Sequence, residues 1–156
     1  MSHNKELAKL RNRLQCKVLI VGIGNRLRGD DGLGPEILKR LKNQIPTLLL
    51  FDVGQVPENY LEKIVKQKPD TIVLIDAVDL GAPPGTIKII EKDGIRNESL
   101  STHNVSLKLV AEYLQKESSA DVFLLGIQPK TTEFGREISE PVRESLEKVV
   151  RMLGRT

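Results

Sequence analysis

Short apolar runs separated by amphipathic segments are the feature that most constrains the fold of this 156-residue chain. Four runs of five or six residues are rich in Val, Ile and Leu, which is typical of strands buried on both faces of a sheet. A fifth segment alternates between apolar and polar residues, as an edge strand does, and it is a candidate for antiparallel pairing. In chain order, the expected strands are 17–22, 47–51, 71–75, 86–90 (the alternating one) and 122–127.

The segments between these runs carry apolar residues at helical spacing, and prolines and a serine mark their first turns. Ser139 is the expected N-cap of the last helix. The expected helices are 5–14, one that opens at Pro35, 57–66, 104–115 and 139–153. This alternation predicts a single α/β domain, residues 1–156, with three layers: a twisted, mostly parallel sheet of about five strands with helices on both faces.

The basic character of the chain is local. Lys and Arg exceed Asp and Glu by 24 to 21, but residues 1–17 hold five basic residues and one acidic residue. The expected organisation is therefore a basic helical arm over 1–15 and a nearly neutral body over 17–153. Aromatic residues make up 3% of the chain and Trp is absent. A local positive charge without stacking residues argues against a nucleic-acid partner.

The single cysteine, Cys16, excludes a disulfide framework and favours a reducing compartment. Because it precedes an apolar run, we expect it to pack inside the protein. No run is long enough to cross a membrane, and the N-terminus has no apolar core of a signal peptide. We therefore expect a cytoplasmic protein without membrane insertion, acting as a monomer.

Polar residues follow the expected strands, where ligands bind in folds of this kind. Asp31 lies in the loop after the first strand, Asp76 ends the third, and His103 precedes the fourth helix. One imidazole and two carboxylates suit a divalent metal or acid–base chemistry. Taken singly, each of these residues also fits a turn or a helix cap.

Two other chemistries fit the sequence less well. The loop after the first strand begins Gly22-Ile23-Gly24, but a dinucleotide fingerprint requires a third glycine where the chain has Leu27, and there is no phosphate-binding Gly-Lys-Ser/Thr. Serine catalysis lacks the Gly-x-Ser-x-Gly elbow.

The same residues belong to a longer pattern that resembles the hydrogenase maturation endopeptidases. The resemblance covers residues 17–153 and is most similar to the subgroup that serves hydrogenase 3, the formate-hydrogenlyase type. Its motifs are Gly22-Ile23-Gly24-Asn25, Gly29-Asp30-Asp31-Gly32, Pro57-Glu58-Asn59, Ile75-Asp76-Ala77-Val78-Asp79, Pro84-Gly85-Thr86-Ile87, Thr102-His103-Asn104 and Leu125-Gly126-Ile127-Gln128-Pro129.

The resemblance implies an aspartic-type endopeptidase that removes the C-terminal extension of a nickel–iron hydrogenase large-subunit precursor after nickel insertion. It places the nickel-contacting and catalytic positions at Asp31, Asp76 and His103. Nickel would come from the bound precursor rather than from a tight site on this chain. Either a carboxylate or a metal-polarised water would attack the peptide carbonyl.

The resemblance also assigns substrate recognition to the loop after the second strand. This chain has Asp52-Val53-Gly54-Gln55 there, where the family usually has Asp-Gly-Gly-Thr or Ser, so Val53 restricts φ at one position. The expected recognition residues are Asp52, Gly54, Gln55 and Asp79. Of these, Asp52 or Asp79 would bind a basic residue that precedes the cleavage site. Two other functions remain open: a metallohydrolase with its own metal, and a nickel-sensing assembly chaperone that binds the precursor without cleaving it.

Overall fold

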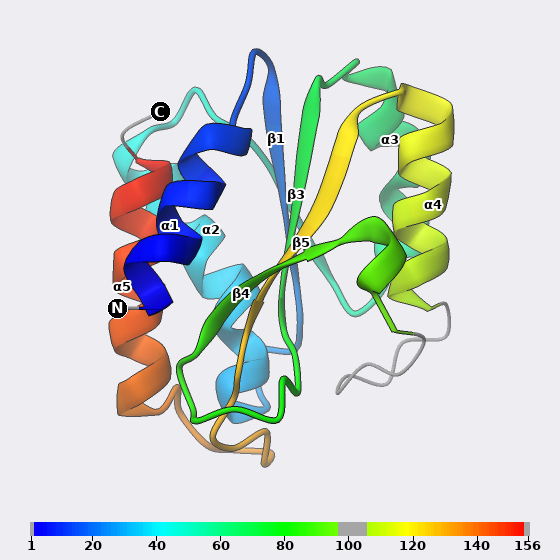
Figure 1. Ribbon diagram of the computed structural model, residues 1–156. Coiled ribbons are helices and arrows are strands. Elements are labelled where there is room, and N and C mark those ends of the chain that lie inside the picture. The colour runs from blue at the N-terminus through cyan, green and yellow to red at the C-terminus, as the bar shows by residue number, and fades with distance from the viewer. Residues whose placement is uncertain (1, 97–105, 155–156) are drawn as a thin grey trace.

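The computed structural model describes residues 2–96 and 106–154, without the side chains of residues 2 and 3 (Figure 1). Five α-helices and five strands alternate along most of the chain, with three short 3₁₀ turns between them. In chain order they are α1 Ser2–Arg13, β1 Val18–Ile23, η1 Gly29–Gly32, α2 Leu33–Gln44, β2 Leu49–Gly54, η2 Pro57–Tyr60, α3 Leu61–Lys66, β3 Thr71–Ala77, β4 Ile87–Glu91, η3 Lys92–Gly94, α4 Leu107–Ser118, β5 Asp121–Ile127 and α5 Glu140–Leu153.

The strands form one sheet in the order β2-β1-β3-β5-β4. Four strands are parallel, and β4 pairs antiparallel with β5 at one edge. The central strand β3 is buried along its whole length, which explains its unbroken apolar run. The predicted three-layer architecture is therefore confirmed, including the alternating segment as an antiparallel edge strand.

Helices cover both faces of this sheet (Figure 1). On one face α1, α2 and α5 pack against the core that contains Ile20, Val73 and Phe123. On the other face α3 and α4 pack against Leu19 and Leu74, the side chains that point the opposite way. Within the described ranges, no helix has both the length and the apolar character needed to span a membrane.

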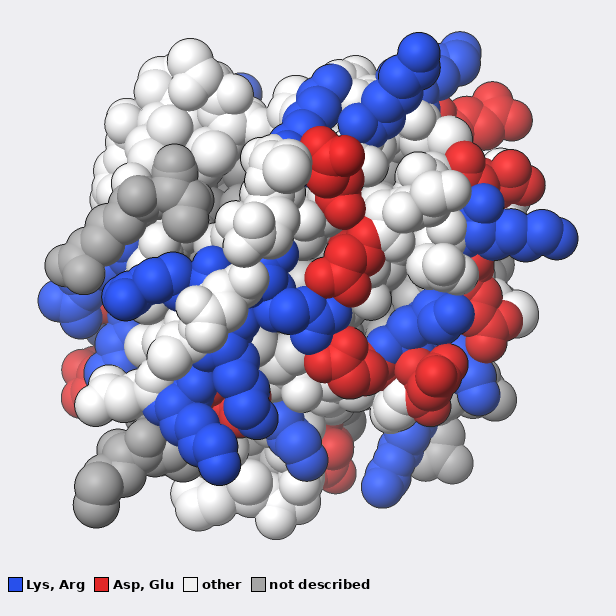
Figure 2. Space-filling view, turned by 45° about the horizontal axis from the view of Figure 1, so that its top comes forward, with Lys and Arg blue, Asp and Glu red and all other residues white. Residues whose placement is uncertain are grey.

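The N-terminal helix α1 belongs to the core of the first face. Leu7 and Leu10 are buried there, and Glu6 accepts a hydrogen bond of 2.8 Å from the Ile89 N–H on the edge strand β4. Its basic residues contribute to the Lys and Arg side chains gathered beside a band of carboxylates in Figure 2. The leucines therefore fix a helix whose outer side is basic.

Arg13, the last residue of α1, ties the helix to the edge strand β4 and to its neighbour β5. Its guanidinium bonds both carboxylate oxygens of Asp121, at 2.9 and 2.8 Å, and reaches Glu91 at 2.6 Å. It also lies 4.4 Å from the centre of the Phe123 ring. Hydrogen bonds to Asp121 and Glu91 raise the pKa of Arg13 above its usual value, so the guanidinium group keeps its charge.

Two local expectations were wrong, and a third, the helix over 57–66, was right in its extent but not in its type. Cys16 is exposed rather than packed, because it occupies the turn between α1 and β1 with a left-handed φ of 57°. The fourth helix begins at Leu107 rather than 104, because Ser106 is extended and caps it by accepting the Leu109 N–H. The segment 57–66 is a 3₁₀ turn followed by the short helix α3.

Candidate functional site

The loop after β1 is shaped around the main chain of Asp31. Gly24 has a φ of 143°, and a β-carbon there would lie 1.8 Å from the Asp31 carbonyl oxygen, so only glycine fits. The next residue, Asn25, donates its main-chain N–H to Asp31 Oδ2 at 2.9 Å. The glycine and the carboxylate thus hold each other in place, and Asp31 is 1% exposed.

The second carboxylate, Asp76, is fully buried near the end of β3. Its Oδ1 accepts the N–H of Ala77 at 2.8 Å. The start of α2 lies directly on this strand end, because a β-carbon on Gly34 would come within 2.8 Å of the Ile75 carbonyl oxygen. Asp31 precedes Gly34 by three residues and Asp76 follows Ile75, so the close approach brings together the segments that carry the two carboxylates.

Asp30 has a different role from its neighbour Asp31. Its fully buried carboxylate accepts hydrogen bonds from the N–H groups of Lys130, Thr131 and Ser139 and from the Ser139 hydroxyl, at 2.7 to 3.2 Å. Four donors around one carboxylate account for its acceptor capacity. Asp30 therefore fastens the loop that follows β5, whereas the Asp31 carboxylate accepts its hydrogen bond from Asn25 in its own loop after β1.

The loop after β2 joins the same edge through two polar contacts. Asn25 Nδ2 donates to Gln55 Oε1 at 3.3 Å, and Arg26 Nη2 lies 3.0 Å from Asp52 Oδ2. Gly54 has the left-handed φ of this loop, at 57°, while Val53 is buried in the core of the second face. Val53 thus packs at the position where the resemblance implies glycine, and a cation from a substrate would have to share Asp52 with Arg26.

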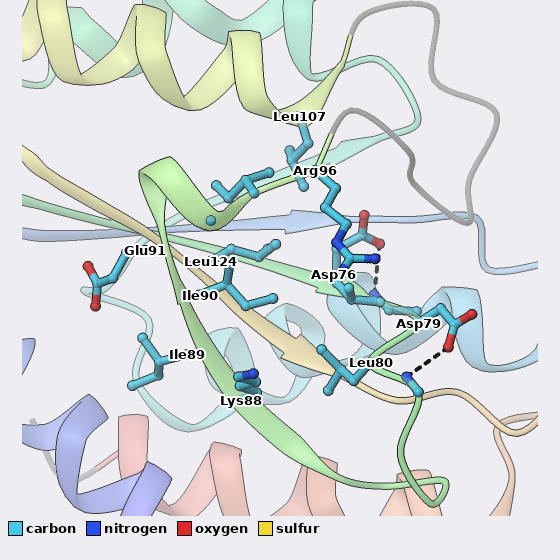
Figure 3. A pocket seen from close by; sticks show the side chains of 15 residues that line it. Asp76, Asp79, Leu80, Lys88, Ile89, Ile90, Glu91, Arg96, Leu107 and Leu124 are labelled. Atoms are coloured by element: carbon cyan, nitrogen blue, oxygen red, sulfur yellow. Dashed lines mark hydrogen bonds between the residues drawn. The ribbon is translucent and has the colours of Figure 1, made fainter.

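A groove of about 800 Å³ opens beside Asp76 (Figure 3). Residues of β4 and the start of α4 line it, and its apolar side chains include Ile90 and Leu107. Arg96 extends toward Asp76 in this view. Asp79 lies further along the wall, and its Oδ1 accepts the Gly81 N–H at 3.1 Å. The groove can accept an extended polypeptide segment that ends at Asp76.

His103 lies outside the described residues, so the structure places two members of the predicted set, Asp31 and Asp76. No cluster of three or more His, Cys, Asp or Glu side chains suited to a metal ion occurs within 2–96 and 106–154. Two hard carboxylates make an incomplete ligand set for a transition metal, and a nitrogen ligand such as an imidazole would complete a more suitable one. The chemistry of the described donors therefore fits a contribution to a metal site rather than a complete one.

Sequence reasoning missed the contacts of two residues that build this edge. Gln128 Oε1 accepts the Leu80 N–H at 2.5 Å and so holds the chain just after Asp79. Ser139 was expected to cap α5 with its side chain, but its hydroxyl is bonded to Asp30 instead. Gln128 stands in a recognisable Gly-Ile-Gln-Pro motif, whereas nothing in the sequence connects Ser139 with residue 30.

Comparison with known proteins gives consistent matches. A family model described as hydrogenase maturation protease matches residues 35–155. A putative hydrogenase maturation protease of Methanocaldococcus jannaschii is 38% identical, with 94% of this chain and 90% of the relative covered. The hydrogenase 3 maturation protease of Escherichia coli is 32% identical, with 86% and 87% covered.

Solved structures agree with these sequence matches. The crystal structure of the NiFe hydrogenase maturation protease HycI from Thermococcus kodakarensis has a TM-score of 0.85 and 33% identity, with 94% of this chain and 97% of that chain covered. The solution structure of the endopeptidase HycI from Escherichia coli has a TM-score of 0.77 and 31% identity, with 87% and 88% covered.

Proposed function

Because this chain belongs to the hydrogenase maturation protease family, we propose that it removes the C-terminal extension of a nickel–iron hydrogenase large-subunit precursor. The observation that carries the proposal is the pair of buried carboxylates, Asp31 in the turn after β1 and Asp76 near the end of the neighbouring strand β3, where Asp76 lines an open groove. Buried carboxylates are expensive to keep without a function, since a charge removed from water must be compensated.

The metal is the precursor's cargo in this proposal. Asp31, Asp76 and His103 contact nickel that the precursor already holds, and this contact positions the bond to be cut. The two described ligands are hard oxygen donors, which hold nickel less firmly than the thiolates of a cysteine-rich site would. Cleavage consumes one water, and the products are the mature subunit and the free extension.

The groove beside Asp76 is where the extension lies in this proposal. Its apolar side chains, Ile90 and Leu107 among them, suit an extended segment with apolar residues, and Lys88 and Arg96 on its walls suit carboxylates. The groove is continuous with Asp76, so a segment bound there presents its preceding peptide bond to the carboxylates.

The direct test is to incubate the protein with nickel-loaded and with nickel-free precursor and to weigh the products. Loss of the extension from the loaded form alone is the expected result, and Asp31→Asn serves as the inactive control. Tight binding without any loss of mass would instead identify an assembly chaperone. Cleavage of a nickel-free precursor at the same rate would contradict the proposed role of the metal.

The cellular setting follows from the same reasoning. We place the reaction in the cytoplasm, where an exposed thiol such as Cys16 stays reduced. The protease acts there as a monomer, and each protease molecule binds one precursor molecule. Fractionation and the mass of the protease in solution test these two statements.

A further inference from the structure

Two large apolar side chains project into solvent beside the candidate site. Leu27 is 60% exposed in the loop after β1, and Phe134 is 76% exposed in the loop after β5. They are the two most exposed large hydrophobic residues among 2–96 and 106–154. Burial of a Leu or Phe side chain gains about 1.5–3 kcal/mol, so a partner that covers both residues would gain binding free energy here.

The two loops that carry them are bonded to one another. The Gly135 N–H donates to the Leu27 carbonyl at 2.7 Å, and the Gly29 N–H donates to the Arg136 carbonyl at 3.1 Å. Arg28 Nε reaches the Thr132 carbonyl at 3.2 Å. Leu27 and Phe134 are thus neighbours on one platform, which consists of the loop after β1 and the loop after β5. Because these hydrogen bonds already order the two loops, binding of a partner costs less conformational entropy.

Asp30 anchors this platform from below. Its carboxylate takes four hydrogen bonds from the loop after β5, and its own N–H donates to the Thr131 carbonyl at 2.9 Å. Since Asp31 is the next residue, the platform and the candidate catalytic carboxylate are parts of one rigid unit. A partner seated on Leu27 and Phe134 is therefore held at a fixed position relative to Asp31.

Cations flank the apolar pair. Arg28 and Lys130 form no ion pair with any residue that the structure describes, whereas Arg136 is paired with Glu133 at 3.1 Å. Glu137, an exposed residue of the same loop, is likewise in no ion pair with a described residue, so these three side chains leave one net positive charge beside the exposed apolar surface. That charge is complementary to an apolar patch bordered by carboxylates.

We propose that Leu27 and Phe134 form a docking surface for the folded body of the hydrogenase precursor, which contacts them through an apolar patch flanked by acidic residues. This inference rests on the proposed function, but it concerns the body of the precursor rather than the extension in the groove. The surface fixes the distance between the precursor body and Asp31, and this fixed distance selects the one peptide bond that is cleaved.

The test measures processing of nickel-loaded precursor by the double variant Leu27→Ser/Phe134→Ser. The expected result is a KM raised about tenfold or more with kcat retained, because the change removes binding contacts and leaves the carboxylates intact. The melting temperature stays unchanged, since both side chains are exposed. Phe134→Leu keeps an apolar surface and is expected to keep the KM of the parent.

The matched control is Leu109→Ser/Tyr113→Ser, which removes exposed apolar residues from α4. Its KM should equal that of the parent. Lys130→Glu should raise KM, while Lys116→Glu on α4 should not. An unchanged KM in the Leu27/Phe134 variant, or an equal loss in the α4 control, would overturn the docking surface.

Direct binding separates this inference from the proposed function. The Leu27→Ser/Phe134→Ser change is introduced into an Asp76→Asn background, and the Kd for nickel-loaded precursor is measured by biolayer interferometry. A weaker Kd than that of Asp76→Asn supports the surface whether or not the parent cleaves. An equal Kd contradicts it. Absence of cleavage by the parent would instead refute the proposed function.

Discussion

Ser139 donates both its main-chain N–H and its hydroxyl to the carboxylate of Asp30, each at 2.7 Å. The two residues are more than a hundred positions apart, and the contact fastens the start of α5 to the loop that carries Asp31. Adjacent aspartates thus differ in their contacts: Asp30 has a structural task, and Asp31 is the one for which we propose a chemical task. Stability and activity measurements can separate them.

Asp30→Asn should lower the stability of the protein by about 3 kcal/mol, because the amide cannot accept from all four donors and buried donors are left unsatisfied. Ser139→Ala removes one of these bonds and should cost about 1 kcal/mol. Denaturant unfolding measures both. If Asp30→Asn were no less stable than Ser139→Ala, Asp30 would not be the anchor of this loop.

Asp31→Asn and Asp76→Asn should each abolish processing, because each removes a charge at the proposed metal contact and no core volume. Asp79→Asn is the control: Asp79 is exposed and accepts a hydrogen bond from the Gly81 N–H, so its variant should keep kcat. Mass spectrometry of the precursor gives the readout. An inactive Asp79→Asn beside an active Asp76→Asn would show that the roles are reversed. His103→Ala should also be inactive.

Gly24→Ala should abolish processing and destabilise the fold, since its β-carbon would lie 1.8 Å from the Asp31 carbonyl oxygen. The loop would have to move, and Asp31 would move with it. Gly81→Ala is the matched variant, with a positive φ of 63° but no atom within 4 Å, and it should cost only the backbone strain of about 1 kcal/mol. Thermal melting and processing assays compare the two, and equal effects would argue against the contact with Asp31.

Leu10→Ala should destabilise the protein by about 3 kcal/mol without changing kcat, because Leu10 is fully buried in the core while α1 contributes no candidate catalytic residue. Lys9→Ala, on the exposed side of the same helix, should change stability by less than about 1 kcal/mol. Deletion of residues 1–12 should likewise lower stability and leave the cleavage chemistry of the folded fraction intact. Loss of kcat in Leu10→Ala would link α1 to the catalytic edge.

The free protein should bind nickel weakly, since its described ligands are two carboxylates and it has a single, distant cysteine. Calorimetry with nickel alone measures this affinity, and Asp31→Asn should remove what binding there is. A sub-micromolar affinity in the free protein would instead favour a metallohydrolase with its own tightly held metal.

The sequence by itself determined the layers, the family and the edge of the sheet at which the site lies. Runs such as 71–75 are too apolar to be anything but buried, and their alternation with helices leaves few topologies. The motifs around Asp31 and Asp76 indicated a hydrogenase maturation protease, and the family matches confirm this. The roles of Asp31, Asp76 and His103 stay predictions.

Only the tertiary structure decided how the residues of that edge divide their tasks. Asp30 and Asp31 are alike in sequence, and they differ because Ser139 and the loop after β5 reach one and Asn25 reaches the other. Cys16 precedes an apolar run and is nevertheless exposed, because a turn separates it from β1. The proximity of Leu27 to Phe134 likewise depends on hydrogen bonds between distant loops. Local pattern sets which segments are buried, whereas the partners of a polar or exposed side chain are set by contacts between segments that are remote along the chain.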